Sequence, residues 1–110
     1  MTSVTPLTFD ILLALADAPR HGYAIIKEIE ARAGTGAGPS TGALYLALQR
    51  MEAEGLIQEA PEQGAVSVDK RRRYWAITPV GRAAAETESE RLATLVAVAR
   101  AKDLLTADRA

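Results

Sequence analysis

The sequence predicts a mainly helical domain in which three helices are followed by a two-stranded hairpin and one long helix. Three observations support this order. Apolar residues recur at helical spacing in three segments before Gly55, two short strand-like segments follow, and Thr78 and Pro79 then open a long stretch with no further proline. A chain of 110 residues has room for one compact core of this kind.

The first two helices are separated by Pro19, which cannot continue a helix. The first helix is expected to follow Thr8, and the second to end near Ala33. The predicted apolar stripe of the first helix consists of Phe9, Leu12, Leu13 and Ala16. That of the second consists of Gly22, Ile25, Ile26, Ile29 and Ala33, with the charged residues off the stripe.

A glycine-rich connector over residues 34–39 leads to the third helix. Ser40 or Thr41 can cap this helix, because a hydroxyl oxygen there accepts a hydrogen bond from a free amide of the first turn. Gly55 offers the left-handed conformation that commonly ends a helix. The apolar stripe between them consists of Leu44, Ala47, Leu48 and Met51.

The hairpin is expected to join a strand over residues 56–59 to a strand over residues 72–77, with a polar turn over residues 61–69 between them. Side chains alternate between the two faces of a strand. The inner face of the second strand is therefore predicted to carry Trp75 and Ile77, next to Arg73, and the outer face Tyr74 and Ala76.

Thr78 and Pro79 form a strong helix start, a hydroxyl cap followed by a proline at the first helical position. The helix is expected to run to about Leu105. Its second half carries an apolar stripe of Leu92, Leu95, Val96 and Ala99, flanked by Val98 and Leu105. Nothing later in the chain could cover this stripe, but a second copy could. Residues 79–110 are thus predicted to be a dimerisation helix and tail behind a domain of residues 1–78.

This order of elements is that of a winged helix-turn-helix, whose third helix enters the DNA major groove. Opposite its apolar stripe this helix carries the polar residues Ser40, Thr41, Tyr45, Gln49 and Glu52. Hydroxyls and early amides suit phosphate oxygens, and Gln49 could pair with adenine. The alternative is a merely solvated helix face.

The hairpin carries a run of four cations, Lys70, Arg71, Arg72 and Arg73. On a wing, each phosphate that such a run neutralises adds salt-dependent affinity for DNA. The alternative is a charged strand edge that keeps the protein soluble. The run shows how a chain with a net charge of −1 can still hold a local basic site.

Composition and single residues argue against other classes of protein. The absence of cysteine excludes disulfide scaffolds and thiolate zinc sites and suits a cytoplasmic protein. The longest apolar runs are too short to cross a bilayer, and Met1 to Asp10 lacks the basic start of a secretory signal, so no membrane partner is expected. His21 stands apart from other metal ligands and is expected to hydrogen-bond the entry turn of the second helix. Ser67 and the glycine-rich connector lack catalytic or phosphate-binding motifs, so neither an enzyme nor a cofactor is predicted.

Three segments, in order and at the right separations, resemble the PadR family of bacterial transcriptional regulators. They are His-Gly-Tyr-Ala-Ile at residues 21–25, the stretch over residues 42–57, and Arg-Arg-Tyr-Trp-Ala-Ile-Thr at residues 72–78 with Gly81. The resemblance covers about residues 8–100 and is greatest to the compact subgroup with a single dimerisation helix. It differs at Ala43, where a hydroxyl residue is usual, and at Leu46, where proline is usual.

The resemblance implies a homodimeric repressor that binds a palindromic operator in double-stranded DNA through the third helix and the wing. It implies that Tyr45 contacts phosphate and that Arg72 and Arg73 belong to the wing. It also implies release by a small-molecule effector bound between the first and last helices, where Phe9 could face the cavity.

Two other classes of function stay open from the sequence. One is a winged-helix module that binds protein and not DNA, which the acidic isoelectric point near 5.8 favours. The other is an accessory subunit of an enzyme, for which the sequence offers no site residues.

Overall fold

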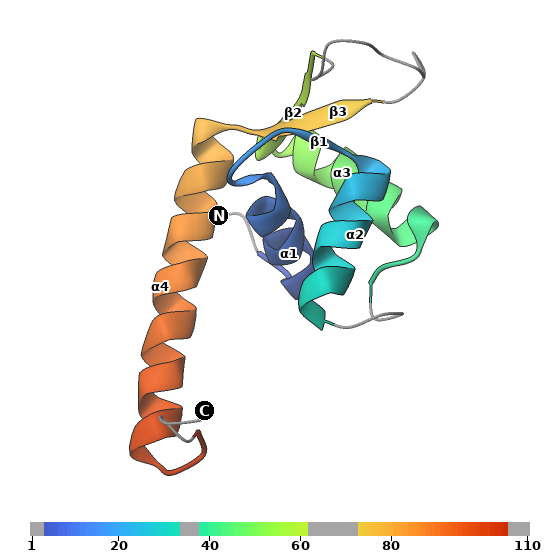
Figure 1. The fold of residues 1–110 in the computed structure, drawn as a ribbon. Helices are drawn as coiled ribbons and strands as arrows, with labels where there is room; N and C mark the ends of the chain where they lie inside the picture. Colours follow the sequence, from blue (N-terminus) through green and yellow to red (C-terminus); the bar gives the residue numbers. More distant parts are fainter. Residues whose placement is uncertain (1–3, 34–37, 62–72, 106–110) are drawn as a thin grey trace.

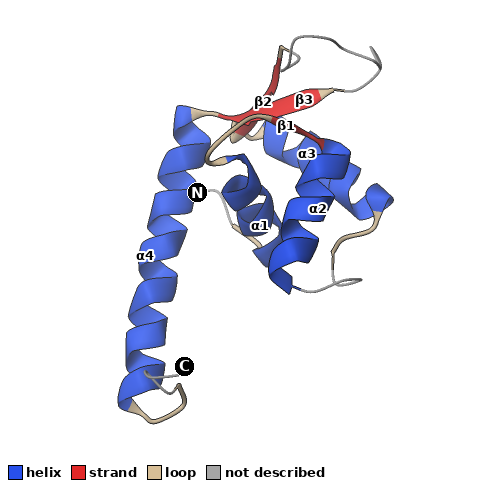
Figure 2. Cartoon of the chain, in the orientation of Figure 1, coloured by secondary structure: helices blue, strands red, loops and turns tan. Residues whose placement is uncertain are grey.

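The structure is a computed structural model and describes residues 4–33, 38–61 and 73–105. Within these ranges it has four helices and three strands (Figures 1 and 2). In chain order they are α1 (Pro6–Leu15), β1 (Arg20–His21), α2 (Gly22–Ala33), α3 (Thr41–Ala53), β2 (Ile57–Ala60), β3 (Tyr74–Ile77) and α4 (Pro79–Ala101). The first three helices pack beneath the sheet, and α4 extends away from them as a long arm (Figure 1). The predicted order of helices, hairpin strands and final long helix is confirmed.

The sheet has β3 in its centre, with β1 and β2 paired antiparallel on either side. The predicted two-stranded hairpin is confirmed as β2 and β3. The structure adds β1, which the sequence did not indicate because β1 is two residues long and only its pairing with β3 defines it. The predicted bounds also shift. β2 begins one residue later, since the Leu56 amide still donates to the Met51 carbonyl at 2.9 Å, and β3 begins only at Tyr74. The predicted turn lies almost entirely outside the described residues.

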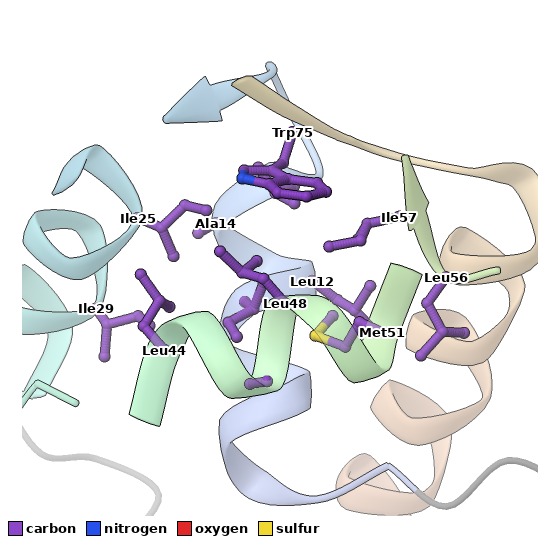
Figure 3. Packing of buried hydrophobic residues seen from close by; sticks show 13 residues of the cluster. Leu12, Ala14, Ile25, Ile29, Leu44, Leu48, Met51, Leu56, Ile57 and Trp75 are labelled. Carbon is purple, nitrogen blue, oxygen red and sulfur yellow. The ribbon is translucent and has the colours of Figure 1, made fainter. Parts of the chain in front are cut away.

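The hydrophobic core lies between the three short helices and the sheet, and Trp75 closes it on the sheet side (Figure 3). Trp75 is 2% exposed, which confirms the prediction that it faces inward, and Ile77 packs against the core while partly exposed. Tyr74, predicted to face outward, is half-buried, because the His21 ring of β1 meets it edge to face at 5.4 Å. The unpredicted strand β1 therefore covers Tyr74, which the alternation of side chains in the sequence had assigned to solvent.

The predicted start and buried face of α1 were wrong in part. The helix begins at Pro6, and the Thr5 hydroxyl caps it by accepting a hydrogen bond from the Thr8 amide at 3.1 Å. Leu13 is 37% exposed, and the buried residues are Thr8, Ile11, Leu12, Ala14 and Leu15. Because α1 is apolar almost all round, spacing alone could not identify its inner face.

The middle helices follow the prediction more closely. The Ser40 hydroxyl caps α3 by accepting from the Ala43 amide at 3.1 Å, and the four predicted stripe residues of α3 are buried. Gly55 has φ +78°, as a left-handed helix end requires. In α2, Gly22, Ile25 and Ile29 are buried, whereas Ile26 is only partly buried and Ala33 is exposed.

The final helix begins as predicted and ends earlier than predicted. The Thr78 hydroxyl caps α4 by accepting from the Gly81 amide at 3.0 Å. The helix ends at Ala101 and not near Leu105, because Asp103 adopts φ 64° and the Leu104 amide turns back to the Ala99 carbonyl at 2.8 Å. Among the described residues, no helix combines the length and apolarity needed to span a membrane.

Candidate nucleic-acid interface

The outer face of α3 presents the polar residues that the sequence singled out on this helix. Thr41, Tyr45 and Gln49 follow one another at four-residue spacing and so lie on one face. All three are exposed, as is Ser40, and Tyr45 is 44% exposed. The buried stripe on the opposite side fixes the helix against the core, so this face is held towards solvent on a rigid support.

Tyr45 is seated against the first turn of α2, at Gly22. A Cβ added to Gly22 would lie 2.6 Å from the hydroxyl oxygen of Tyr45 and 3.0 Å from the ring carbon that bears it. Only glycine leaves room for this approach. Gly22 of α2 therefore leaves the space in which the hydroxyl of Tyr45, on α3, lies.

A second polar patch beside this contact was missed from the sequence. Tyr23 is 59% exposed, and the Nζ of Lys27 lies 5.2 Å from the centre of its ring, within range of a cation–π interaction. The contact with Tyr23, and then the nearby Glu30 carboxylate, raises the pKa of Lys27, which keeps this group cationic. The four-residue spacing of an aromatic and a lysine off the apolar stripe was the signal available in the sequence.

His21 takes the structural role expected of it. Its Nδ1 accepts a hydrogen bond from the Ala24 amide at 3.2 Å, which satisfies a free donor of the first turn of α2. Its ring also stacks with that of Tyr23, with centroids 6.4 Å apart and planes at 12°. The histidine thus supports the patch that Tyr23 and Lys27 form.

Arg73 is the one residue of the predicted basic run that the structure describes, and Lys70, Arg71 and Arg72 lie outside the described residues. Its Nε and Nη2 donate to the two carboxylate oxygens of Glu59 at 2.9 and 3.2 Å. Its guanidinium carbon lies 4.8 Å from the centre of the Trp75 ring. Arg73 is therefore paired with a carboxylate and stacked on the edge of the core.

The pair with Glu59 joins the two sides of the hairpin, and Arg73 also interacts electrostatically with α3. The hydrogen bonds to Glu59 raise the pKa of Arg73, and the carboxylate of Glu52 on α3 raises it further. The same hydrogen bonds lower the pKa of Glu59. The guanidinium of Arg73 thus lies within electrostatic range of Glu52 on α3.

The arm of α4 bears the apolar residues that were predicted to form a dimer interface. Leu95 is 51% and Val96 40% exposed, whereas Leu92 and Ala99 are half-buried. Leu104, in the turn after the helix, is 77% exposed. The described part of the chain leaves this stripe largely open to solvent.

Two hollows lie between α1 and α4. The larger is an open groove of about 560 Å³, lined on α1 and β3 by Leu13 and Ile77 and on α4 by Ala85, Glu86, Ser89, Glu90, Ala93 and Thr94, among others. The smaller, of about 210 Å³, is lined by Phe9 together with Glu88, Arg91 and Leu92 of α4. Phe9 thus faces a cavity next to the last helix, as expected.

Comparison with known protein families identifies the family of the chain. Residues 11–87 match the family described as "Transcriptional regulator PadR-like family". The chain belongs to the PadR-like family of transcriptional regulators. Members of this family regulate transcription and are not enzymes, which agrees with the prediction that the chain is no enzyme.

This PadR-like chain is similar to one curated protein and to several solved structures. Over 85 residues it is 44% identical to an uncharacterised 37.1 kDa protein in transposon TN4556 of Streptomyces fradiae, an alignment that covers 77% of the chain. The chain spans only 22% of the length of that relative. A PadR family transcription regulator from Clostridium difficile has 29% identity and a TM-score of 0.67, with 84% of this chain and 94% of the other covered.

A structure of Bacillus subtilis PadR in complex with operator DNA shares the fold of the chain, with a TM-score of 0.62 at 18% identity. The likeness covers 76% of this chain and 46% of the other.

Proposed function

We propose that this PadR-like protein is a cytoplasmic repressor that binds a palindromic operator in double-stranded DNA as a homodimer. The observation that carries the proposal is the exposed outer face of α3, with Tyr45 seated on Gly22, together with the cationic Arg73 at the start of β3. An exposed helix face of this size fits the major groove, and the adjoining cation suits the phosphate backbone.

Each part of the surface has a separate role in this proposal. Ser40, Thr41 and Tyr45 contact phosphate oxygens at the start of α3, and Gln49, one turn further on, reads a base edge. The wing residues Lys70, Arg71, Arg72 and Arg73 bind the backbone. Tyr23 and Lys27 add a backbone contact from α2, because Tyr23 directly follows Gly22 and holds the exposed Lys27 cation over its ring.

The DNA-binding roles are tested by measuring affinity for the DNA upstream of the protein's own gene and for a random duplex across a salt series. Tyr45→Phe should weaken binding to both duplexes with little change in salt slope, because a neutral hydroxyl releases no counterion. Gln49→Ala should lower the preference for the operator by about 1 to 3 kcal/mol. Arg73→Ala should lower the salt slope by up to about one unit. If the parent protein binds neither duplex at low salt, the result would favour a protein-interaction module over a DNA-binding regulator.

Dimerisation is assigned to residues 79–110 and DNA binding to residues 1–78. The exposed Leu95 and Val96 support this division, since a second copy of α4 would cover them. A two-fold dimer presents two α3 helices to successive major grooves, which is why the operator is expected to be palindromic.

Sedimentation equilibrium tests the interface. Leu95→Glu should sediment as a monomer at concentrations where the parent is a dimer, because the new carboxylate would be buried without a partner. Thr87→Glu places the same charge at an exposed polar position on α4 and should remain a dimer. A dimeric Leu95→Glu variant would exclude this stripe as the interface.

The groove between α1 and α4 is our candidate for the effector site. Leu13 and Ile77 give it an apolar wall, and its rim carries charges of both signs, which suits an amphipathic molecule. The charged lining residues are Arg82, Glu86 and Glu90. Planar aromatic compounds can be screened for release of DNA from the parent and from Ala93→Trp, whose indole would fill the groove. Equal release from both proteins would place the effector elsewhere.

A further inference from the structure

The ion pair between Glu59 and Arg73 occupies the part of the wing that DNA would use. Glu59 lies directly opposite Trp75 in the register of β2 and β3, so the two side chains project to the same face of the sheet. Arg73 reaches this face as well, since its guanidinium lies over the Trp75 ring. The carboxylate, the guanidinium and the indole are thus gathered at the edge of the core nearest α3.

The carboxylate of Glu59 uses the donors that a phosphate would need. It takes Nε and Nη2 of Arg73 side by side, which is the geometry in which a guanidinium also binds two phosphate oxygens. The lowered pKa of Glu59 keeps it ionised at neutral pH. A DNA phosphate that approaches the same edge of Arg73 must displace Glu59.

The exchange needs no unfolding. The Arg73 and Glu59 side chains are 54% and 49% exposed, so solvent and a phosphate can reach both. Exposed pairs of this kind are weak. Trp75 is fixed in the core and stacks on the guanidinium independently of Glu59, so Arg73 keeps a platform when the carboxylate leaves.

We propose that Glu59 limits the affinity of the protein for DNA by competing with a DNA phosphate for the guanidinium of Arg73. This inference rests on the proposed function, since it requires that the wing meets DNA. In this proposal Glu59 weakens DNA binding, whereas the basic run over residues 70–73 strengthens it. Phosphate contacts are sequence-independent, so the restraint acts on random DNA as well as on the operator.

The test uses the full chain, a random duplex and a salt series, with four proteins besides the parent: Glu59→Gln, Arg73→Ala, the double variant and Glu54→Gln. Glu54 is an exposed carboxylate at the end of α3 with no ion pair among the described residues, so its change removes one negative charge without releasing a cation. Circular dichroism and thermal unfolding confirm that each variant is folded before its affinity is compared.

Glu59→Gln should bind random DNA about two- to fivefold more tightly than the parent at low salt, which is the range expected for loss of an exposed ion pair. Its salt slope should be steeper by the part of about one unit that Arg73 does not contribute in the parent, because Arg73 then contacts phosphate fully. Glu54→Gln should change the affinity less and leave the slope as it is. In the Arg73→Ala background, Glu59→Gln should give no more gain than Glu54→Gln gives in the parent.

Three results would overturn the proposal. Weaker binding by Glu59→Gln would mean that Glu59 positions Arg73 and does not restrain it. A gain equal to that of Glu54→Gln, or one that persists without Arg73, would reduce the effect to general charge repulsion. A parent that fails to bind DNA at any salt concentration would remove the proposed function itself, and this inference with it, whereas the first two results leave DNA binding intact.

Discussion

Among the glycines that the structure describes, Gly81 should be the one whose replacement destabilises the fold most, although it lies within the first turn of a helix. A Cβ added there would run into the backbone carbonyl oxygen of Leu56 and lie 2.9 Å from its carbonyl carbon. Leu56 is fully buried, and its carbonyl accepts a hydrogen bond from the Thr78 amide at 3.1 Å. Neither side can give way without separating the start of α4 from the end of α3.

The magnitude of Gly81→Ala follows from three contributions. Forcing extra atoms into a packed site costs about 1 to 3 kcal/mol. Weakening the hydrogen bond from Thr78 to Leu56 costs about 0.5 to 1.5 kcal/mol. The better helix propensity of alanine returns about 1 kcal/mol. We therefore expect the variant to lose about 0.5 to 3.5 kcal/mol of unfolding free energy.

Gly42→Ala is the matched control, because Gly42 also lies in the first turn of a helix and nothing lies within 4 Å of an added Cβ. This variant should gain up to about 1 kcal/mol. Urea unfolding, followed by far-ultraviolet circular dichroism at one fixed protein concentration, measures both changes, since the stability of a dimer depends on concentration. If Gly81→Ala were as stable as Gly42→Ala, the close approach of α4 to Leu56 would be refuted.

Four further variants address the core, the α2 to α3 contact and an exposed ion pair. Trp75→Ala should cost about 3 to 5 kcal/mol in urea unfolding. Trp75→Phe should cost clearly less, because the buried indole N–H has no hydrogen-bond partner in the described part of the chain; equal losses would mean that this N–H is bonded. Gly22→Ala displaces only the outer end of the Tyr45 side chain, so it should change stability by less than about 1 kcal/mol but weaken DNA binding as Tyr45→Phe does; unchanged binding would separate Tyr45 from the interface. The hydrogen bonds from Arg91 lower the pKa of Glu88 below the usual 4.5, so this pair stabilises the fold above that pH and the contribution is lost as the pH falls through the lowered pKa. Glu88→Gln should therefore be less stable than the parent at neutral pH and equal to it at strongly acidic pH, and a difference independent of pH would show that the ion pair contributes nothing.

The order of the helices and the ends of α2 and α3, with the start of α4, could be predicted because they depend on local chemistry. Ser40 and Thr78 cap the helices that follow them, and each hydroxyl accepts from the amide three residues later. Gly55 takes the left-handed conformation at the end of α3. Each of these features involves residues close together in the chain, so the sequence pattern contains the whole interaction.

The candidate site shows the same division. Exposure of Thr41, Tyr45 and Gln49 on one face of α3 follows from the position of its apolar stripe, and periodicity predicts it. The pairing of Arg73 with Glu59 does not follow, because the two residues are fourteen positions apart and only the register of β2 and β3 brings them together. Their DNA-binding roles stay predictions.

What the sequence by itself determined is therefore a set of helices, caps and a winged-helix order, together with the residues that α3 presents to solvent. Only the tertiary structure decided which side of the almost wholly apolar α1 is buried, because that choice depends on the elements packed around it. It alone added β1, since two residues become a strand only when β3 pairs with them. It alone seated Tyr45 on Gly22 and Arg73 on Trp75, because contacts between distant segments depend on how the chain packs and leave no periodic trace in the sequence.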